Sequence, residues 1–402
     1  MRFCLQAVAV AGSPDRGCAG PRRPSDRREE DVVRIGIPTE VKEHEYRVAL
    51  TPAGAHSLVE GGHQVLVQAG AGVGAGWPDE AYATSGARIV PHAADAWAAD
   101  LVCKIKEPVR AEYPLLRRDQ VLFTYLHLAA SRSCTDALLA AGTTAIAYET
   151  VEHRDGALPL LAPMSEVAGR LATQEGAHHL LKQHGGRGVL LGGVPGAPPG
   201  RVVVIGAGTA GRHAVDMAVG LRADVTVLDV SVPRLRELDA TYRGRVHTVA
   251  STPLAVQQAV ERADLVVGAV LVPGARAPHL VDDATVARMR PGSVLVDVAI
   301  DQGGCFEGSR PTTYADPTFQ VHDSLFFCVT NMPGAVPVTS TLALTAATLP
   351  YLAVLANRGW HAACRADGAL ARGLNVHDGA VLHSGVAAAH GLPLTEVAEV
   401  LG

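Results

Sequence analysis

The segment RVVVIGAGTAG, residues 201–211, places three glycines between a short apolar run and a stretch of helical character. In a strand, turn and helix each glycine has its own task. Gly206 permits the tight turn, Gly208 lets the backbone approach a pyrophosphate, and Gly211 lets the helix pack closely. The first turn of such a helix also presents unpaired amide groups and the positive end of the helix dipole to an anion. The segment therefore predicts a dinucleotide-binding Rossmann unit.

The next expected strand, Val225–Leu228, ends at Asp229. A carboxylate at this point of a Rossmann unit accepts the hydroxyls of the adenosine ribose, and it would repel the 2′-phosphate of NADP. Asp229 could instead be an ordinary turn residue at a strand end. Its place relative to the glycines favours the first interpretation, so NAD is the expected cofactor.

Short β-branched runs alternate with Ala-rich helical stretches on both sides of the glycine motif, which predicts an α/β fold with mostly parallel, covered sheets. A chain of 402 residues exceeds the usual size of a single core, so two Rossmann-like, doubly wound domains are expected. The expected strands are Val33–Ile37, Val65–Gln68, Leu101–Lys106, Val121–His127, Thr144–Tyr148, Val202–Ile205, Val225–Leu228, Leu265–Val270 and Val294–Val298. The expected helices are Ser165–His184, Thr339–Asn357 and one between Thr51 and Gly61-Gly62 that has Pro52 at its first position.

Composition excludes several classes of protein. With 35 Lys and Arg against 40 Asp and Glu, nucleic acid is not an expected partner. The 7 cysteines form no C-x-x-C pair and are expected to be free thiols, and the 17 histidines include no H-E-x-x-H motif, so no metal is expected. No uninterrupted apolar run approaches the ~20 residues of a membrane span, and a cytoplasmic protein is expected. Residues 1–32 are expected to be a disordered tail or an unused upstream start, with a degenerate signal peptide at Phe3–Ala11 as the alternative.

Charged side chains follow four of the expected strands, at the sheet edge where α/β proteins bind ligands. They are Arg47 after the first strand, Lys104 and Lys106 at the third, His127 at the fourth and Asp301 after the last. An enzyme that oxidises an amino acid needs a cation for the substrate carboxylate and an acid or base for the protons. These positions supply both kinds of group.

Each candidate also has a purely structural interpretation. Charged residues commonly form surface ion pairs, and a lone histidine is often a core residue held by backbone groups, as His127 could be. Arg47 could form a surface pair with Glu43 or Glu45, and Asp301 could be a turn-forming residue. Lys104 and Lys106 share a strand face because they are two residues apart, so one of them could only form an ion pair with Glu107.

From about Val33 to Gly402 the chain resembles the family of alanine dehydrogenase and pyridine nucleotide transhydrogenase. The segments that carry the resemblance are RIGIPTEVKEHEYRVALTP, KIKEP, LFTYLHLAAS, ALPLLAPMSEVAGR, GGVPG, VVVIGAGTAG, GAVLVPGARAP, LVDVAIDQGGCFEGSRPTTY and NMPGAVPVTST. The resemblance implies two lobes with a cleft between them. It divides the chain into a catalytic domain (33–160), an NAD-binding domain (161–336) and a C-terminal segment (337–402) that returns to the catalytic domain.

The resemblance implies a reversible, NAD-dependent oxidative deamination of L-alanine to pyruvate and ammonium. Arg47 and Lys106, rather than Lys104, would hold the substrate carboxylate, His127 would be the general acid and base, and Asp301 would be its partner. The NAD contacts that it implies, together with the motif glycines, are Ser165, Gly206, Gly208, Thr209, Ala210, Gly211, Asp229, Arg234, Ser251, Val270, Leu271, Val298, Ala299, Ile300, Arg310, Val329, Thr330, Asn331 and Met332. A homo-oligomer, a hexamer, is implied as well.

Three competing assignments stay open. An NAD(H)-binding protein like the transhydrogenase α-subunit shares the architecture, but it has no amino-acid carboxylate to hold. A saccharopine-type dehydrogenase would need a roomier and differently charged cleft. A non-catalytic NAD-binding protein would retain the fold and lose the chemistry. The presence of Arg47, Lys106, His127 and Asp301 together favours the amino-acid dehydrogenase. Residues 1–32 lie outside the family pattern, and NMPGAVPVTST departs from it slightly.

Overall fold

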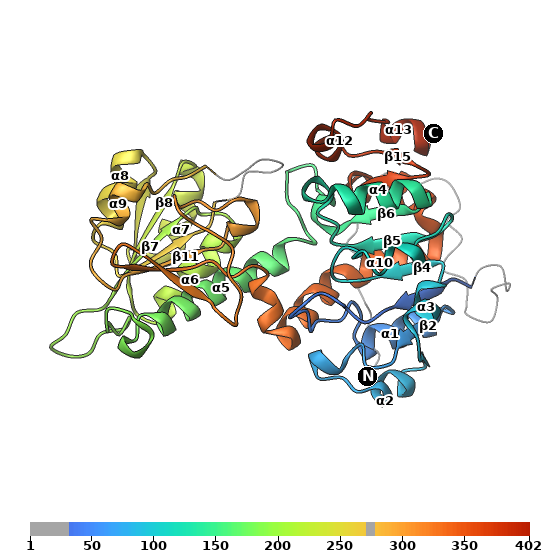
Figure 1. Ribbon diagram of the computed structural model, residues 1–402, viewed down its shortest axis with the longest axis horizontal. Coiled ribbons are helices and arrows are strands. Elements are labelled where there is room, and N and C mark those ends of the chain that lie inside the picture. The colour runs from blue at the N-terminus through green and yellow to red at the C-terminus, as the bar shows by residue number, and fades with distance from the viewer. Residues whose placement is uncertain (1–31, 271–277) are drawn as a thin grey trace.

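The computed structural model describes residues 32–270 and 278–402, so the expectations for the N-terminal tail and for Leu271 lie outside the described residues. The described chain forms two sheets that lie side by side, each with helices on its faces (Figure 1). Both sheets are mostly parallel and α/β in character. The predicted fold class is confirmed.

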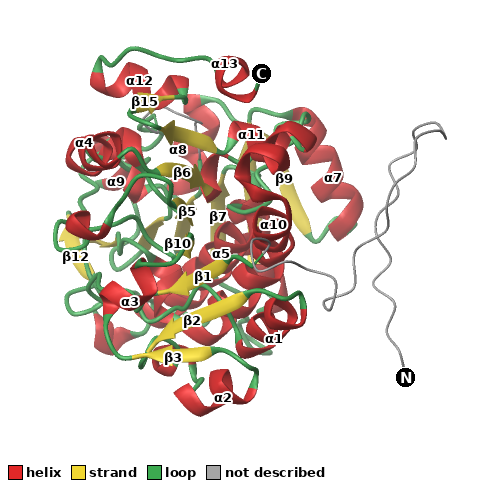
Figure 2. Cartoon of the chain, turned by 90° about the vertical axis from the view of Figure 1, so that its right-hand side faces the viewer, coloured by secondary structure: helices red, strands yellow, loops and turns green. Residues whose placement is uncertain are grey.

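The first sheet has eight strands within the described residues, in the order β15-β14-β6-β5-β4-β1-β2-β3. β14 pairs antiparallel with β6 and with β15, and the remaining neighbours are parallel. Figure 2 shows β3 at one end of this sheet and β15 at the other. The strands are β1 (Arg34–Ile37), β2 (Gln64–Gln68), β3 (Arg88–Val90), β4 (Leu101–Cys103), β5 (Val121–Thr124), β6 (Thr144–Ala147), β14 (Leu374–His377) and β15 (Ala380–Val381).

Short helices accompany the first sheet. Thr51 caps α1 by accepting from the amide of Gly54, with Pro52 at the first helical position, as the sequence predicts. The helices are α1 (Pro52–Glu60), α2 (Asp79–Thr84), α3 (Ala93–Trp97), α4 (Arg132–Ala141), α11 (Gly368–Arg372), α12 (Ser384–His390) and α13 (Val397–Leu401).

The second sheet has seven strands within the described residues, in the order β12-β13-β11-β10-β7-β8-β9, and only its β12–β13 pair is antiparallel. Its strands are β7 (Arg201–Ile205), β8 (Asp224–Asp229), β9 (Val246–Ala250), β10 (Leu265–Gly268), β11 (Val294–Asp297), β12 (Thr318–Val321) and β13 (Ser324–Phe327). Its helices are α6 (Thr209–Gly220), α7 (Val232–Tyr242), α8 (Pro253–Val260) and α9 (Asp283–Val286).

Two long helices, α5 (Ala162–His179) and α10 (Pro337–Ala366), pack against each other, and Figure 1 shows α5 beside the second sheet and α10 beside the first. α5 packs closely on α6. The contact is so close that a Cβ on Gly169 would lie 2.0 Å from the carbonyl oxygen of Ala210. α10 is long and apolar enough to cross a membrane by length and composition alone, a test that the core helix of a soluble protein also passes. It buries Leu344, Leu352 and Leu355 in the protein core.

Several expected boundaries are wrong. β4 and β5 end at Cys103 and Thr124, short of Lys106 and His127, because the chain turns out of the sheet where the site residues begin. α5 begins at Ala162 and ends at His179, and α10 continues to Ala366 across a non-helical residue, Gly359. No strand was predicted after Asn357, and the polar C-terminal segment supplies β14 and β15.

Candidate active site

The carboxyl ends of β1, β4 and β5 carry three of the predicted side chains. These strands are neighbours in the sheet, and carboxyl ends of parallel strands meet at one edge. Arg47 lies in the loop after β1, Lys106 follows β4, and His127 follows β5. Residues distant in sequence are thus gathered at one edge because the strands pair in this order.

Arg47 is buried, with 2% of its surface exposed, and its guanidinium group is held by three neighbours. Its Nε donates to Glu45 Oε1 at 2.6 Å, and its Nη2 donates to Asn331 Oδ1 at 2.8 Å. Its Nη1 lies 3.0 Å from Met164 Sδ. The alternative of a surface ion pair is therefore wrong in its location, because the pair with Glu45 lies inside the protein.

Glu45 and Asn331 complete this cluster. Asn331 Nδ2 donates to Glu45 Oε2 at 3.0 Å, so the amide bridges both members of the ion pair. Burial raises the pKa of Glu45, but the hydrogen bonds and charge of Arg47 outweigh it and leave the pKa below its ordinary value. Asn331 follows the second sheet, has φ 56°, and connects the two lobes at this point. Sequence reasoning considered Glu45 only as a surface partner.

The two lysines of the KIKEP segment have different surroundings. Lys104 is fully buried, with Nζ 2.8 Å from Glu112 Oε1 and 3.4 Å from Glu40 Oε2. Neither lysine forms the ion pair with Glu107 that the structural alternative held for one of them, and Glu107 pairs with Lys42 instead. The two lysines do not share a strand face, because β4 has ended at Cys103.

Charged side chains of the other candidates affect the pKa of Lys106. Burial lowers the pKa of its ammonium group, and the positive charge of Arg47 lowers it further. Glu107, Asp301 and Glu45 act in the opposite direction. The charge of Asp301, from the second sheet, therefore reaches a side chain of the first.

His127 is exposed, which excludes the core-histidine alternative; 43% of its side chain is accessible. Its backbone is in the left-handed region, with φ 47°, and its ring stacks on Tyr125 at 5.8 Å between centroids. Its amide donates to Glu149 Oε1 at 2.6 Å, and the same oxygen lies 3.9 Å from its Nδ1. Glu149 follows β6, the neighbouring strand, so the rule of carboxyl ends could have found it.

Asp301 lies in a single 3₁₀ turn, Ile300–Gln302, just after β11, and its side chain is exposed. The turn is fastened by Asp297, a fully buried carboxylate at the end of the strand. Asp297 accepts from the amides of Ala299 at 3.0 Å and Cys305 at 2.9 Å. Asp301 is thus a turn residue, as its structural interpretation held, on a turn that is rigidly anchored.

The glycine loop has the geometry that a pyrophosphate requires. Gly206 has φ 101°, which favours glycine, and a Cβ on Gly211 would lie 1.8 Å from the carbonyl oxygen of Gly206. A Cβ on Gly208 would meet nothing within 4 Å, so this side of the loop is open. α6 begins at Thr209 with no side chain capping its first amides. These residues fit a dinucleotide.

Asp229 ends β8 beside this loop and is 5% exposed. Its carboxylate accepts from the amides of Ala207 at 2.6 Å and Ser231 at 2.7 Å, so it anchors the loop. Arg234 lies 3.9 Å from it, and the amide of Ser251 donates to its carbonyl oxygen at 3.0 Å. Three residues that the resemblance assigned to the nucleotide therefore lie together.

The other predicted cofactor residues lie at the ends of neighbouring elements. The guanidinium group of Arg310 lies 4.2 Å from the centre of the Phe319 ring. Ala299, Ile300, Val329 and Met332 are buried. The remaining positions are the first turn of α5 (Ser165), the start of α6 (Thr209, Ala210), the residues after β10 and β11 (Val270, Val298) and the segment before the 3₁₀ turn that follows β13 (Thr330).

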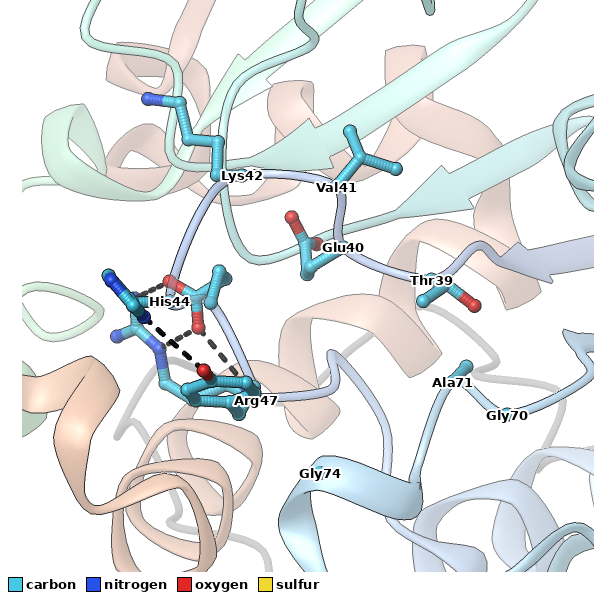
Figure 3. Close-up of a pocket in the computed structure, with 11 residues that line it drawn as sticks. Thr39, Glu40, Val41, Lys42, His44, Arg47, Gly70, Ala71 and Gly74 are labelled. Carbon is cyan, nitrogen blue, oxygen red and sulfur yellow. Dashed lines mark hydrogen bonds and ion pairs between the residues drawn. The ribbon is translucent and has the colours of Figure 1, made fainter.

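A cavity of about 300 Å³ adjoins Arg47 at the carboxyl ends of β1 and β2. Figure 3 shows Glu40, Lys42, His44 and Arg47 along the loop after β1, with Gly70 to Gly74 opposite. Within the two described ranges no group of three His, Cys, Asp or Glu side chains is arranged to hold a metal. The five described cysteines, 103, 134, 305, 328 and 364, are buried and free.

One lobe is a Rossmann unit with an open glycine loop. The other is an α/β lobe that gathers cations and a histidine at one sheet edge. Together they define the class of two-lobed nucleotide-binding oxidoreductases. The family pattern described as alanine dehydrogenase/PNT, N-terminal domain, matches residues 36–168, and the C-terminal domain pattern of the same family matches residues 172–384. The chain belongs to the alanine dehydrogenase/PNT family.

Individual relatives agree with this assignment. The chain is 62% identical over 370 residues, 92% of its length and 100% of the relative's, to an alanine dehydrogenase of Mycobacterium tuberculosis. A solved L-alanine dehydrogenase superposes with a TM-score of 0.87 at 51% identity and covers 89% of this chain and 99% of its own. A transhydrogenase from Sinorhizobium meliloti superposes with a TM-score of 0.75 at 26% identity, over 87% of this chain and 99% of its own. The resemblance seen in the sequence is confirmed.

Proposed function

We propose that this protein is an L-alanine dehydrogenase that oxidises L-alanine to pyruvate and ammonium and catalyses the reverse reductive amination. The observation that supports this best is the grouping of Arg47, Lys106 and His127 at one sheet edge, in a chain that is 62% identical to an alanine dehydrogenase. A transhydrogenase, which transfers a hydride between nucleotides, needs no such grip on an amino-acid carboxylate. The chain is accordingly an oxidoreductase with small-molecule substrates.

Arg47 and Lys106 hold the substrate carboxylate in this proposal. Arg47 offers a planar pair of donors, and Glu45 and Asn331 fix the plane of its guanidinium group before substrate arrives. Lys106 contributes a second positive charge, and the charges of Glu45 and Asp301 help to keep it protonated despite its burial. The two cations thereby orient Cα as well as bind the carboxylate.

His127 moves the protons. Oxidation of an amine releases a proton from nitrogen, and the water that then adds to the imine carbon must lose another. The imidazole carries one proton at a time: it passes the first to solvent, takes the second from the attacking water and gives it to the departing amine, and the reverse reaction runs these transfers backwards. Glu149 fixes the backbone of His127 through the amide and lies near Nδ1, which favours Nε2 as the atom that faces the substrate. Asp301 helps to orient the water and the amine from the other lobe.

The nucleotide is proposed to be NAD, held by the glycine loop, the amides at the start of α6, and Asp229. When bound, it accepts the hydride equivalent from Cα of alanine. The carboxylate of Asp229 retains lone pairs beyond its two backbone hydrogen bonds for the ribose hydroxyls, and its negative charge disfavours a 2′-phosphate. The other predicted contacts, from Ser165 to Met332, are proposed to line the nucleotide and its nicotinamide end.

The domain division proposed for this activity is residues 33–160 with 337–402 as the catalytic domain and 161–336 as the NAD-binding domain. The pairing of β14 with β6 supports the return of the C-terminal segment to the first sheet. The protein is further proposed to be cytoplasmic and to form a homohexamer, and light scattering on the purified protein would test the hexamer.

The test is the formation of NADH from NAD⁺ and L-alanine, followed by absorbance. We expect turnover with L-alanine and NAD⁺, little with L-lysine, and little with NADP⁺. Loss of alanine turnover in His127→Ala, with NADH binding retained, would support the assigned role. If the wild-type chain binds NADH but does not turn over L-alanine, the transhydrogenase-like or non-catalytic alternative replaces this proposal.

A further inference from the structure

Lys104, which the sequence singled out as a candidate, has no part in the proposed reaction, although a fully buried lysine requires an explanation. Its ammonium group lies between two carboxylates, 2.8 Å from Glu112 Oε1 and 3.4 Å from Glu40 Oε2. Its Nζ also lies 5.7 Å from the centre of the Trp97 ring. We call Glu40, Lys104 and Glu112 the buried triad.

Both carboxylates of the buried triad bind the backbone of the loop that carries Lys106. Glu40 accepts from the amide of Ile105 at 2.6 Å and lies 3.4 Å from the amide of Lys106. Glu112 accepts from the amide of Val109 at 2.9 Å. One carboxylate therefore holds the loop at Lys106 and the other holds it a few residues further on.

The carbonyl group of Lys106, in the next peptide unit, is fixed as well. The hydroxyl of Thr124, at the end of β5, donates to the carbonyl oxygen of Lys106 at 3.1 Å. Lys106 therefore has its amide directed at Glu40 and its carbonyl at Thr124, and the charge of Arg47 acts on its side chain. A lysine binds a substrate carboxylate more tightly when the backbone that carries the lysine is already fixed before binding.

The charges of the buried triad favour this arrangement. Burial lowers the pKa of Lys104, but Glu40 and Glu112 outweigh it and leave the pKa above its ordinary value. Burial raises the pKa of Glu40 above its ordinary value, and the charge of Lys104 offsets only part of that rise. Without Lys104, the two carboxylates would lie close together in the core with no opposite charge.

We propose that Glu40, Lys104 and Glu112 are positioning residues that set the backbone of Lys106 for the substrate carboxylate. The proposal rests on the function proposed above, in which Lys106 binds that carboxylate. Glu40 is the central member, because it alone contacts the Lys106 amide, and it also lines the cavity beside Arg47 (Figure 3). A residue that only stabilised the fold would not affect substrate binding by the folded protein.

The experiment measures KM for L-alanine, kcat, the Kd for NADH and the melting temperature of Glu40→Gln. This variant retains one acceptor for Ile105 and loses the carboxylate that faces Lys106. We expect KM for L-alanine to rise about tenfold, with an unchanged Kd for NADH, because the loss of one hydrogen bond to a charged group has an effect of this order.

The control is Asp100→Asn, which weakens a pair with Arg34 at the amino end of β1, at the opposite edge of the same sheet. It is expected to change the melting temperature at most and to leave KM unaltered. If Glu40→Gln behaves like this control, with an unchanged KM, the buried triad has only a structural role and the inference is wrong.

Glu112→Gln is the second variant, for use if Glu40→Gln does not fold. It retains an acceptor for Val109 and weakens the hold on Lys104, so a smaller rise in KM is expected. An unchanged KM in this variant would also contradict the inference. Failure of the wild-type protein to turn over L-alanine would instead contradict the proposed function.

Discussion

The two lobes form their ligand sites in different ways. The glycine loop of the second sheet consists of backbone: Gly206, Gly208 and Gly211 lie within one short segment and act through missing side chains and free amides. The edge of the first sheet consists of side chains from separate strands, and each is oriented by carboxylates such as Glu45 and Glu149. A backbone site is local in sequence, and a side-chain site depends on the topology of the sheet.

The largest effect is expected for His127→Ala, which removes the proposed acid and base from the side-chain site. The rate kcat should fall by roughly 10²–10⁴-fold, the usual contribution of a positioned proton-transfer group. Kd for NADH should not change, because the glycine loop belongs to the other lobe. Stopped-flow turnover and fluorescence titration with NADH measure the two quantities. A variant that loses both together would show that the two sites are not separable.

Gly211→Ala tests the backbone site. The new Cβ would lie 1.8 Å from the carbonyl oxygen of Gly206, and backbone cannot move away as a flexible side chain can. We expect a loss of unfolding free energy of about 1–3 kcal/mol and a large loss of NADH affinity. Gly220→Ala on the same helix is the matched control, because its Cβ would meet nothing within 4 Å. Equal NADH affinity in both variants would contradict the assigned role of the loop.

The comparison between the two lobes extends to two histidines, one of which is exposed and the other buried. His127 is exposed at the first sheet, while His179 is buried at the end of α5 with its ring 5.3 Å from that of Phe327. Burial, assisted by the charges of His178 and His184, lowers the pKa of His179 to about 4. The unfolded chain takes up this proton near pH 6.5 and the folded chain only near pH 4, so stability must fall as the pH decreases between these values.

The measurement is urea unfolding between pH 7 and pH 4 for the wild type and for His179→Leu. Full protonation of one such group corresponds to a loss of up to about 3 kcal/mol, and the leucine variant should lose that part of the pH dependence. Parallel curves for the two proteins would assign the acid sensitivity to other groups.

The smallest effect is expected for Asn331→Gly, which removes the amide that joins the two lobes at Arg47 and Glu45. Glycine suits the φ of 56°, so the backbone should retain its course. KM for L-alanine should rise roughly three- to tenfold, because Arg47 loses one of its hydrogen bonds while Glu45 still holds it. Steady-state kinetics at saturating NAD⁺ measure the change, and a decrease in KM would show that Asn331 competes with the substrate.

The sequence predicted the α/β fold because β-branched runs alternate with helical stretches, and it located the glycine loop because that motif is contiguous. It placed Lys104 and Lys106 on one face, since nothing local reveals that β4 ends at Cys103. The burial of Glu45, Glu112 and Asp297 was not predicted for the same reason: a carboxylate in the sequence gives no sign of whether it will be buried. The rule of carboxyl ends marks Glu149 as a candidate, but the strand order that brings it to His127 is a tertiary property.

The pairing of β14 with β6 has a consequence for how the chain is made. During synthesis β6 leaves the ribosome long before Leu374–His377. The side of β6 that later pairs with β14 therefore stays open, as an unpaired edge strand, while the whole second sheet is produced. An open edge is a template for pairing with other chains. Newly made chains of this protein are therefore most vulnerable to aggregation in the interval before their last residues emerge, and a ribosomal stall in that interval would leave the second sheet complete and the first unfinished.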